Sequence, residues 1–103
     1  MYAIGQGVPQ DYLQGVKWWR LAADQGLAGA QFSLGTMYDG GKGVPQDYVQ
    51  AYKWYDLAAS RFPASEKEYR DVAVKNRDSI TAKMTPPAQI AEAQKLAREW
   101  RPK

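Results

Sequence analysis

Small and bulky apolar residues recur every three or four positions between residues 11 and 25, with polar residues between them. This spacing predicts an amphipathic helix, because residues three and four apart share one helix face. Asp11 is expected to begin the helix and cap its first turn, and Gly26 is expected to end it. The predicted core face comprises Tyr12, Gly15, Trp18, Trp19, Ala22 and Ala23, and the opposite face comprises Leu13, Lys17, Arg20 and Leu21.

The same pattern returns 36 residues later, in a segment that is largely a copy of the first. The hexapeptide at 7–12 recurs unchanged at 43–48, and 15 of the 23 residues in 1–23 match those in 37–59. The equivalent core residues are Tyr48, Ala51, Trp54, Tyr55, Ala58 and Ala59, so large and small side chains keep their places. Repetition at this spacing predicts a solenoid in which neighbouring helix pairs stack in register.

Three further helices complete the predicted all-α fold. One covers about 28–39, precedes a glycine-rich turn and has a buried stripe of Ala30, Gln31, Leu34, Gly35 and Tyr38. A longer one covers about 64–84, with a stripe of Tyr69, Ala73, Asn76, Ile80 and Met84. Thr85 is expected to cap a last helix, in which Ile90, Ala97 and Trp100 cover the open end of the array.

These elements divide the chain into four predicted parts. Residues 1–10 are the remnant of a preceding repeat and its turn, and 11–40 form a first repeat. Residues 41–84 form a second repeat with a divergent long second helix, and 85–103 form a C-terminal capping helix. Because Met1 and Tyr2 align with Met37 and Tyr38 in the middle of a repeat, we expect the sequence to start partway through one.

Composition excludes several classes of chemistry. The 103 residues include no Cys and no His, which excludes a disulfide framework, a thiol nucleophile, a zinc finger and a Ser-His-Asp triad. The net charge is +3, but acidic residues are interleaved with the basic ones, which disfavours nucleic-acid binding. No apolar run is long enough to span a membrane. No metal or cofactor is predicted.

The glycine-rich segment 40–43 allows two interpretations, a helix-ending turn or a phosphate-binding loop. A phosphate loop has its Lys after the last Gly, followed by Ser or Thr. Here Lys42 precedes Gly43 and neither hydroxyl residue follows, so the turn is favoured.

The chain resembles the Sel1-like repeat family, helix-turn-helix relatives of the tetratricopeptide repeats. The family's pattern is matched by Ala28, Ala30, Leu34, Gly35, Met37, Tyr38, Gly41, Gly43, Val44, Asp47, Tyr48, Ala51, Trp54, Tyr55, Ala58 and Ala59. The closing segment from Met84 to Trp100 is similar to the last helix of many bacterial members, which favours a bacterial origin. The resemblance implies an alpha-alpha superhelix of such helix pairs, closed by a C-terminal capping helix and used as a scaffold or adaptor for protein partners.

Three functional hypotheses follow. The first is a noncatalytic module that binds a protein or peptide in a concave groove. The groove would be lined by outward residues of the two repeated helices, where apolar side chains beside Lys and Arg favour an apolar segment with an acidic element. Its predicted residues are Leu13, Lys17, Arg20, Leu21, Val49, Lys53, Asp56 and Leu57.

The second hypothesis is self-association, as in a homodimer, through an N-terminal edge formed by Tyr2, Trp18 and Trp19. Arrays of this kind generally need three or more units, and the sequence holds fewer than two complete ones.

The third hypothesis is a β-lactam or peptidoglycan hydrolase, implied by analogy with a cysteine-rich, secreted branch of the family. This chain lacks Cys, and none of its Ser residues has the Ser-x-x-Lys spacing, so no catalytic residue is assigned.

Overall fold

The computed structural model describes residues 9–84 and 87–102, with the side chains of 14–84 and 89–102. Five α-helices make up this part of the chain: α2 (Pro9–Asp24), α3 (Ala28–Gly40), α4 (Tyr48–Arg61), α5 (Lys67–Thr81) and α6 (Pro87–Glu99). A short 3₁₀ helix, η1 (Ala64–Glu66), precedes α5. The described residues contain no strand, which confirms the predicted all-α class.

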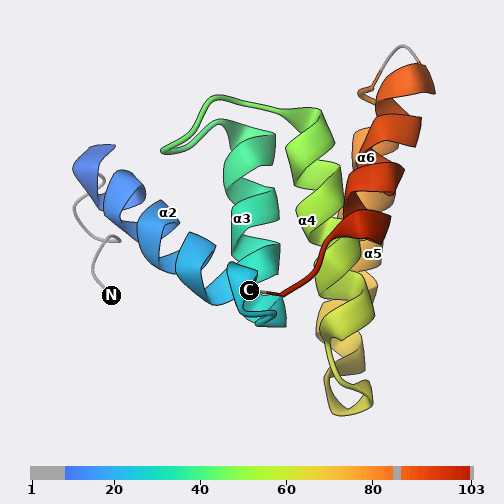
Figure 1. Ribbon diagram of the computed structural model, residues 1–103, viewed down its shortest axis with the longest axis horizontal. Helices are drawn as coiled ribbons and strands as arrows, with labels where there is room; N and C mark the ends of the chain where they lie inside the picture. The colour runs from blue at the N-terminus through green and yellow to red at the C-terminus, as the bar shows by residue number, and fades with distance from the viewer. Residues whose placement is uncertain (1–8, 85–86, 103) are drawn as a thin grey trace.

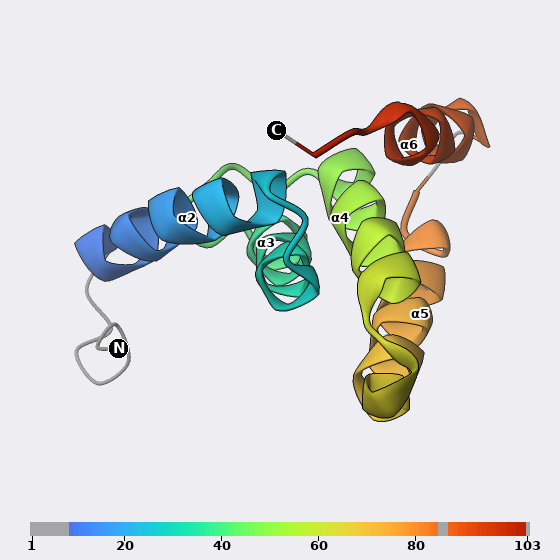
Figure 2. The ribbon, with the colours of Figure 1, turned by 60° about the horizontal axis from the view of Figure 1, so that its bottom comes forward.

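The helices stack in chain order. Figure 1 shows α3 between α2 and α4, and α4 packs extensively on both α3 and α5. In Figure 2, α5 and α6 both lie on the side of α4 that faces away from α3, and both pack on α4. The second repeated helix is therefore enclosed by three neighbours, whereas α2 packs chiefly against α3.

The start of α4 agrees with the sequence prediction, whereas the starts of α2 and α5 differ from it. Asp47 caps α4 as the repeat pattern indicates, because its Oδ1 accepts a hydrogen bond of 3.1 Å from the backbone N–H of Gln50. Its counterpart Asp11 is not the first residue of α2, which begins at Pro9. The predicted helix over 64–84 is divided into η1 and a shorter α5, because Pro63 adopts an extended backbone and one 3₁₀ turn intervenes. Thr85, the expected cap of the last helix, lies outside the described residues.

The turn between α3 and α4 requires glycine. Gly41 ends α3 with φ of 69° and Gly43 has φ of 76°, in the left-handed region that other residues avoid. The N–H of Gly41 bonds back to the carbonyl of Met37. The segment therefore acts as the predicted turn.

The core fills most of the predicted stripes, and the equivalent positions of α4 are more deeply buried than those of α2. Ala51, Trp54, Tyr55, Ala58 and Ala59 are all buried, as are Ala30, Gln31, Leu34 and Gly35. Burial raises the pKa of Tyr55, so its hydroxyl stays protonated where it bonds Thr36 at 3.0 Å.

Three placements correct the predicted stripes. Trp18 is 65% exposed although its repeat equivalent, Trp54, is 2% exposed, because α3 and α6 cover that face of α4 and no described element covers it on α2. Tyr69 is 62% exposed and stacks on Phe62 at 5.7 Å instead of entering the core. Trp100 packs edge-on against Trp54, with ring centroids 6.2 Å apart, so it reaches back to the repeats and does not cover their end.

Candidate functional site

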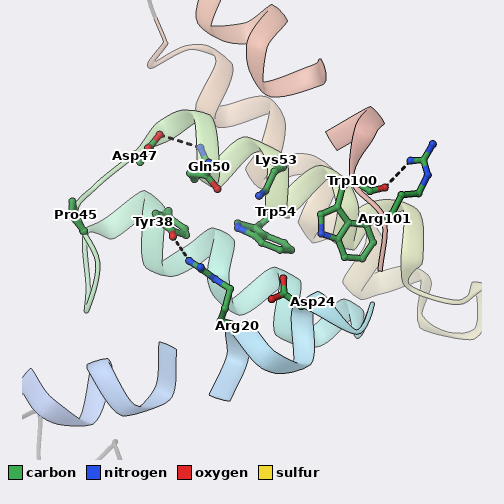
Figure 3. Close-up of a pocket in the computed structure, with 10 residues that line it drawn as sticks. All are labelled: Arg20, Asp24, Tyr38, Pro45, Asp47, Gln50, Lys53, Trp54, Trp100 and Arg101. Atoms are coloured by element: carbon green, nitrogen blue, oxygen red, sulfur yellow. Dashed lines mark hydrogen bonds between the residues drawn. The ribbon is translucent and has the colours of Figure 1, made fainter. Parts of the chain in front are cut away.

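A cleft of about 610 Å³ opens between α2 and α4 (Figure 3). Its size lies within the range of about 300–1,000 Å³ that is typical of ligand pockets. We call it the α2–α4 cleft. It is lined by residues of both repeated helices, the end of α3, the following loop and the C-terminal segment: Arg20, Asp24, Tyr38, Pro45, Asp47, Gln50, Lys53, Trp54, Trp100 and Arg101.

Aromatic rings occupy the middle of this cleft. Figure 3 shows the Trp54 indole between Tyr38 and Trp100. Nη2 of Arg20 donates a hydrogen bond to the Tyr38 hydroxyl, and the guanidinium carbon lies 5.9 Å from the Tyr38 ring centre. This bond links α2 to the end of α3 and holds the guanidinium inside the cleft.

Cationic groups surround the two tryptophans. Nζ of Lys53 lies 4.1 Å from the Trp54 ring centre, and the Arg61 guanidinium lies 5.0 Å from the Trp100 ring centre, both within cation–π range. Nη1 of Arg101 donates to the backbone carbonyls of Arg98 and Trp100, at 3.1 and 2.8 Å. The C-terminal segment is thereby held against α4 by ring contacts.

Two buried donors of the cleft have no acceptor. Among the described side chains, Nε of Arg20 and Nε1 of Trp54 are buried without a hydrogen-bond partner. Oε1 of Gln31 is also unpartnered, but Gln31 does not line the cleft, and its Nε2 donates to the Ala23 carbonyl at 3.2 Å. The buried groups of the cleft that lack a hydrogen-bond partner are therefore both donors.

The structure distributes the predicted groove residues over several environments. Arg20 and Lys53 line the α2–α4 cleft, whereas Lys17 and Leu21 are exposed on α2 outside its lining. Val49 packs against the cluster that contains Tyr52. The side chain of Leu13 lies outside the described residues.

Two of those residues turn away from the expected groove. Leu57 is buried at 7% exposure in the core shared with α2 and α3, so the prediction that it faces outward is wrong. Asp56 accepts a hydrogen bond of 2.9 Å from Nη1 of Arg77 on α5, which directs its carboxylate toward α5. A helix wheel could not find this, because it does not include the partner helix.

Sequence reasoning missed most of the cleft lining. The missed residues are Asp24, Tyr38, Pro45, Asp47, Gln50, Trp54, Trp100 and Arg101. Some of these residues could have been found from the sequence, since residues 45–48 belong to the duplicated hexapeptide that joins each helix pair to the next. The sequence could not place Trp100 and Arg101 in the cleft, because they reach it only through the packing of α6 along α4.

The predicted self-association edge is described in part. Trp18 is exposed on α2, while Trp19 is half-buried against the core cluster of Val16 and Ala23. Tyr2 lies outside the described residues.

The described residues offer little beyond this cleft for chemistry. The hydroxyls of Ser33 and Ser60 donate to helix carbonyls, those of Gly29 at 3.1 Å and Leu57 at 2.9 Å. No cluster of three carboxylates suited to a metal ion occurs in the part of the chain that is described. None of the helices in that part is long and apolar enough to cross a membrane.

Comparison with known proteins identifies the repeats. The family model named Sel1 repeat matches residues 1–27 and 28–61. No curated protein and no solved structure matches the chain. Sel1 repeats form helical solenoids and generally act as protein–protein interaction modules. Because the two matches cover more than half of the sequence, the chain belongs to the Sel1 repeat family.

Proposed function

We propose that this protein is a noncatalytic interaction module, and that its α2–α4 cleft binds a segment of a partner protein. The observation that carries the proposal is the composition of the cleft: a half-open hollow with aromatic rings in the middle and cations around them. Aromatic and Arg side chains are the residues enriched at the energetic centres of protein interfaces.

The position of the cleft supports the proposal. It is formed jointly by the two repeated helices, so it requires that the pairs stack in register. Figure 3 shows side chains from α2, α4 and the C-terminal segment converging on one space. A partner segment lying there would contact both repeats at once, as expected of a scaffold.

The test compares two equivalent lysines. Lys53 lines the cleft, whereas Lys17, its counterpart 36 residues earlier, is exposed outside the lining. A random dodecapeptide library displayed on phage is selected on the immobilised chain, and recovered peptides are then measured against Lys53→Glu and Lys17→Glu. We expect Lys53→Glu to weaken binding by about tenfold or more, because the reversed charge would repel the partner group that Lys53 contacts. Lys17→Glu should change the affinity less than about twofold, because Lys17 lies outside the cleft.

Thermal melting of both variants shows that each is folded. Equal effects of the two substitutions, or no peptide recovered above background, would contradict binding in this cleft.

A second candidate function, self-association through α2, is favoured by one observation. Trp18 is exposed while its repeat equivalent Trp54 is buried under neighbouring helices, so α2 presents a packing face without a described cover. Leu21 lies one turn further along α2 and is also exposed. A second copy of the chain would bury both side chains by contributing a helix to this face.

Sedimentation across a concentration series tests this candidate. We expect the wild type to dimerise and Trp18→Glu to raise the dimer dissociation constant at least about tenfold, since burial of a large side chain contributes about 1.5–3 kcal/mol. The control is Val72→Glu, which places the same charge on exposed α5. A wild-type chain that stays monomeric at millimolar concentration would reject self-association.

A further inference from the structure

We infer that the α2–α4 cleft selects segments that carry an aspartate or glutamate, whose carboxylate is bound by Nε of Arg20 and Nε1 of Trp54. The inference rests on the proposed function and specifies the chemistry of the partner. It assigns to Trp54 a role in specificity besides its role in packing.

The two buried groups of the cleft that lack a hydrogen-bond partner are both donors. Nε of Arg20 and Nε1 of Trp54 can only donate, and both are buried without an acceptor. Two oxygen atoms of the lining are already engaged: the Tyr38 hydroxyl accepts from Nη2 of Arg20, and Oδ1 of Asp47 accepts from the backbone N–H of Gln50. Buried donors without partners are unfavourable, so an incoming acceptor oxygen removes an existing penalty.

The charges of the cleft lining also favour a carboxylate ligand. The lining contains three cationic side chains, Arg20, Lys53 and Arg101, against two carboxylates, Asp24 and Asp47. The carboxylate of Asp47 is directed to the first turn of α4, where it complements the helix N-terminus. The guanidinium of Arg101 is likewise engaged, on carbonyls of its own segment, and points away from the middle of the cleft in Figure 3. The cations near the two buried donors are therefore Arg20 and Lys53, against the carboxylate of Asp24. A charged acceptor bonds more strongly than a neutral carbonyl does.

Access to the indole N–H of Trp54 depends on the side chain of Lys53. In Figure 3 the nitrogen-bearing edge of the Trp54 indole faces Tyr38 and Arg20, and the amino group of Lys53 lies beside this edge. Nζ of Lys53 lies 4.1 Å from the Trp54 ring centre. Rotation of the Lys53 side chain would uncover the indole N–H, and its ammonium group would then pair with the same carboxylate. One anion would thus satisfy two buried donors and a lysine.

The experiment uses peptides recovered from the dodecapeptide library on the full chain. We expect Asp and Glu to be enriched among them relative to the unselected library. One acidic peptide is synthesised with a fluorescein label, together with its Asn or Gln analogue, and both are titrated against Trp54→Phe. This substitution keeps an aromatic ring, but it removes the N–H donor together with part of the buried indole. The decisive quantity is therefore the difference between the two peptides on the same variant, because any change in packing affects both peptides alike.

We expect Trp54→Phe to weaken the acidic peptide by about tenfold, the effect of losing one hydrogen bond to a charged group, and to leave the amide analogue within about twofold. The matched control is Trp18→Phe, the same change at the repeat-equivalent position, which should affect neither peptide. The melting temperature of Trp54→Phe should fall, because Trp54 is 2% exposed in the core cluster and the smaller ring leaves part of its space empty. Both peptides are therefore titrated at a temperature at which this variant is folded.

Each result decides the inference separately from the proposed function. Recovered peptides without enriched Asp or Glu, or an equal effect of Trp54→Phe on the two peptides, would overturn the inference and leave cleft binding intact. Recovery of no peptide would overturn the proposed function itself. If Trp54→Phe does not fold, Arg20→Lys provides the same test, because it keeps the charge but lacks the guanidinium Nε, and it should show the same selective loss.

Discussion

Replacement of Leu34 by alanine is expected to lower the free energy of unfolding by about 2–5 kcal/mol. Leu34 has 0% exposure and lies in the core cluster where α2, α3 and α4 meet, with Val16, Trp54 and Leu57 among its members. Truncation removes buried methyl groups and leaves a cavity at the junction of the two repeats. Because this cluster joins α2 to α3 and α4, the cavity cannot collapse without moving α2 relative to the other two helices.

Urea denaturation followed by circular dichroism measures this loss. Leu21→Ala is the matched control, since Leu21 is 57% exposed on α2 and its truncation should change stability by no more than about 0.5 kcal/mol. Similar losses in the two variants would show that the core does not lie where the structure places it.

Gly35→Ala is expected to destabilise the protein by about 1–3 kcal/mol, although alanine is the better helix former by about 1 kcal/mol. A Cβ atom at Gly35 would lie 2.7 Å from Cδ1 and 2.9 Å from Cε1 of Tyr55. The Tyr55 ring has little freedom to move, because it packs edge-on against Phe32 at 5.4 Å and its hydroxyl bonds Thr36. The steric conflict therefore outweighs the gain in helix propensity.

Gly29→Ala on the same helix provides the control for this effect. Nothing lies within 4 Å of a Cβ built at Gly29, so alanine there should stabilise the protein by up to about 1 kcal/mol. Thermal melting of the two variants should give shifts of opposite sign. If Gly35→Ala melts at or above the wild-type temperature, α3 and α4 do not approach each other as closely as the structure shows.

Gly35 illustrates how far periodicity could predict the fold. Helix periodicity placed Gly35 on the buried stripe of its helix, and in the structure the ring of Tyr55 lies where a side chain at this position would have to go. The helix-ending turn at Gly41 and the cap at Asp47 were likewise predictable, because local backbone chemistry decides them.

The candidate site was much less predictable than the fold. Of the groove residues that periodicity indicated, Arg20 and Lys53 line the α2–α4 cleft, and their role in binding a partner stays a prediction. Periodicity misassigned Leu57 and Asp56, whose surroundings depend on α2 and α5. The same wheel position can face solvent, core or an ion-pair partner, and the packing of other helices selects among them.

By itself, the sequence determined that this protein is a stack of paired helices, because a duplicated pattern of large and small side chains encodes the same local structure twice. Only the tertiary structure decided that the two copies differ in use. Trp18 and Trp54 occupy the same place in the repeat, yet one is exposed and the other lies beneath Lys53 and Trp100. The physical reason is that burial depends on which helices surround a position, and α4 has a neighbour on each side where α2 packs chiefly on α3.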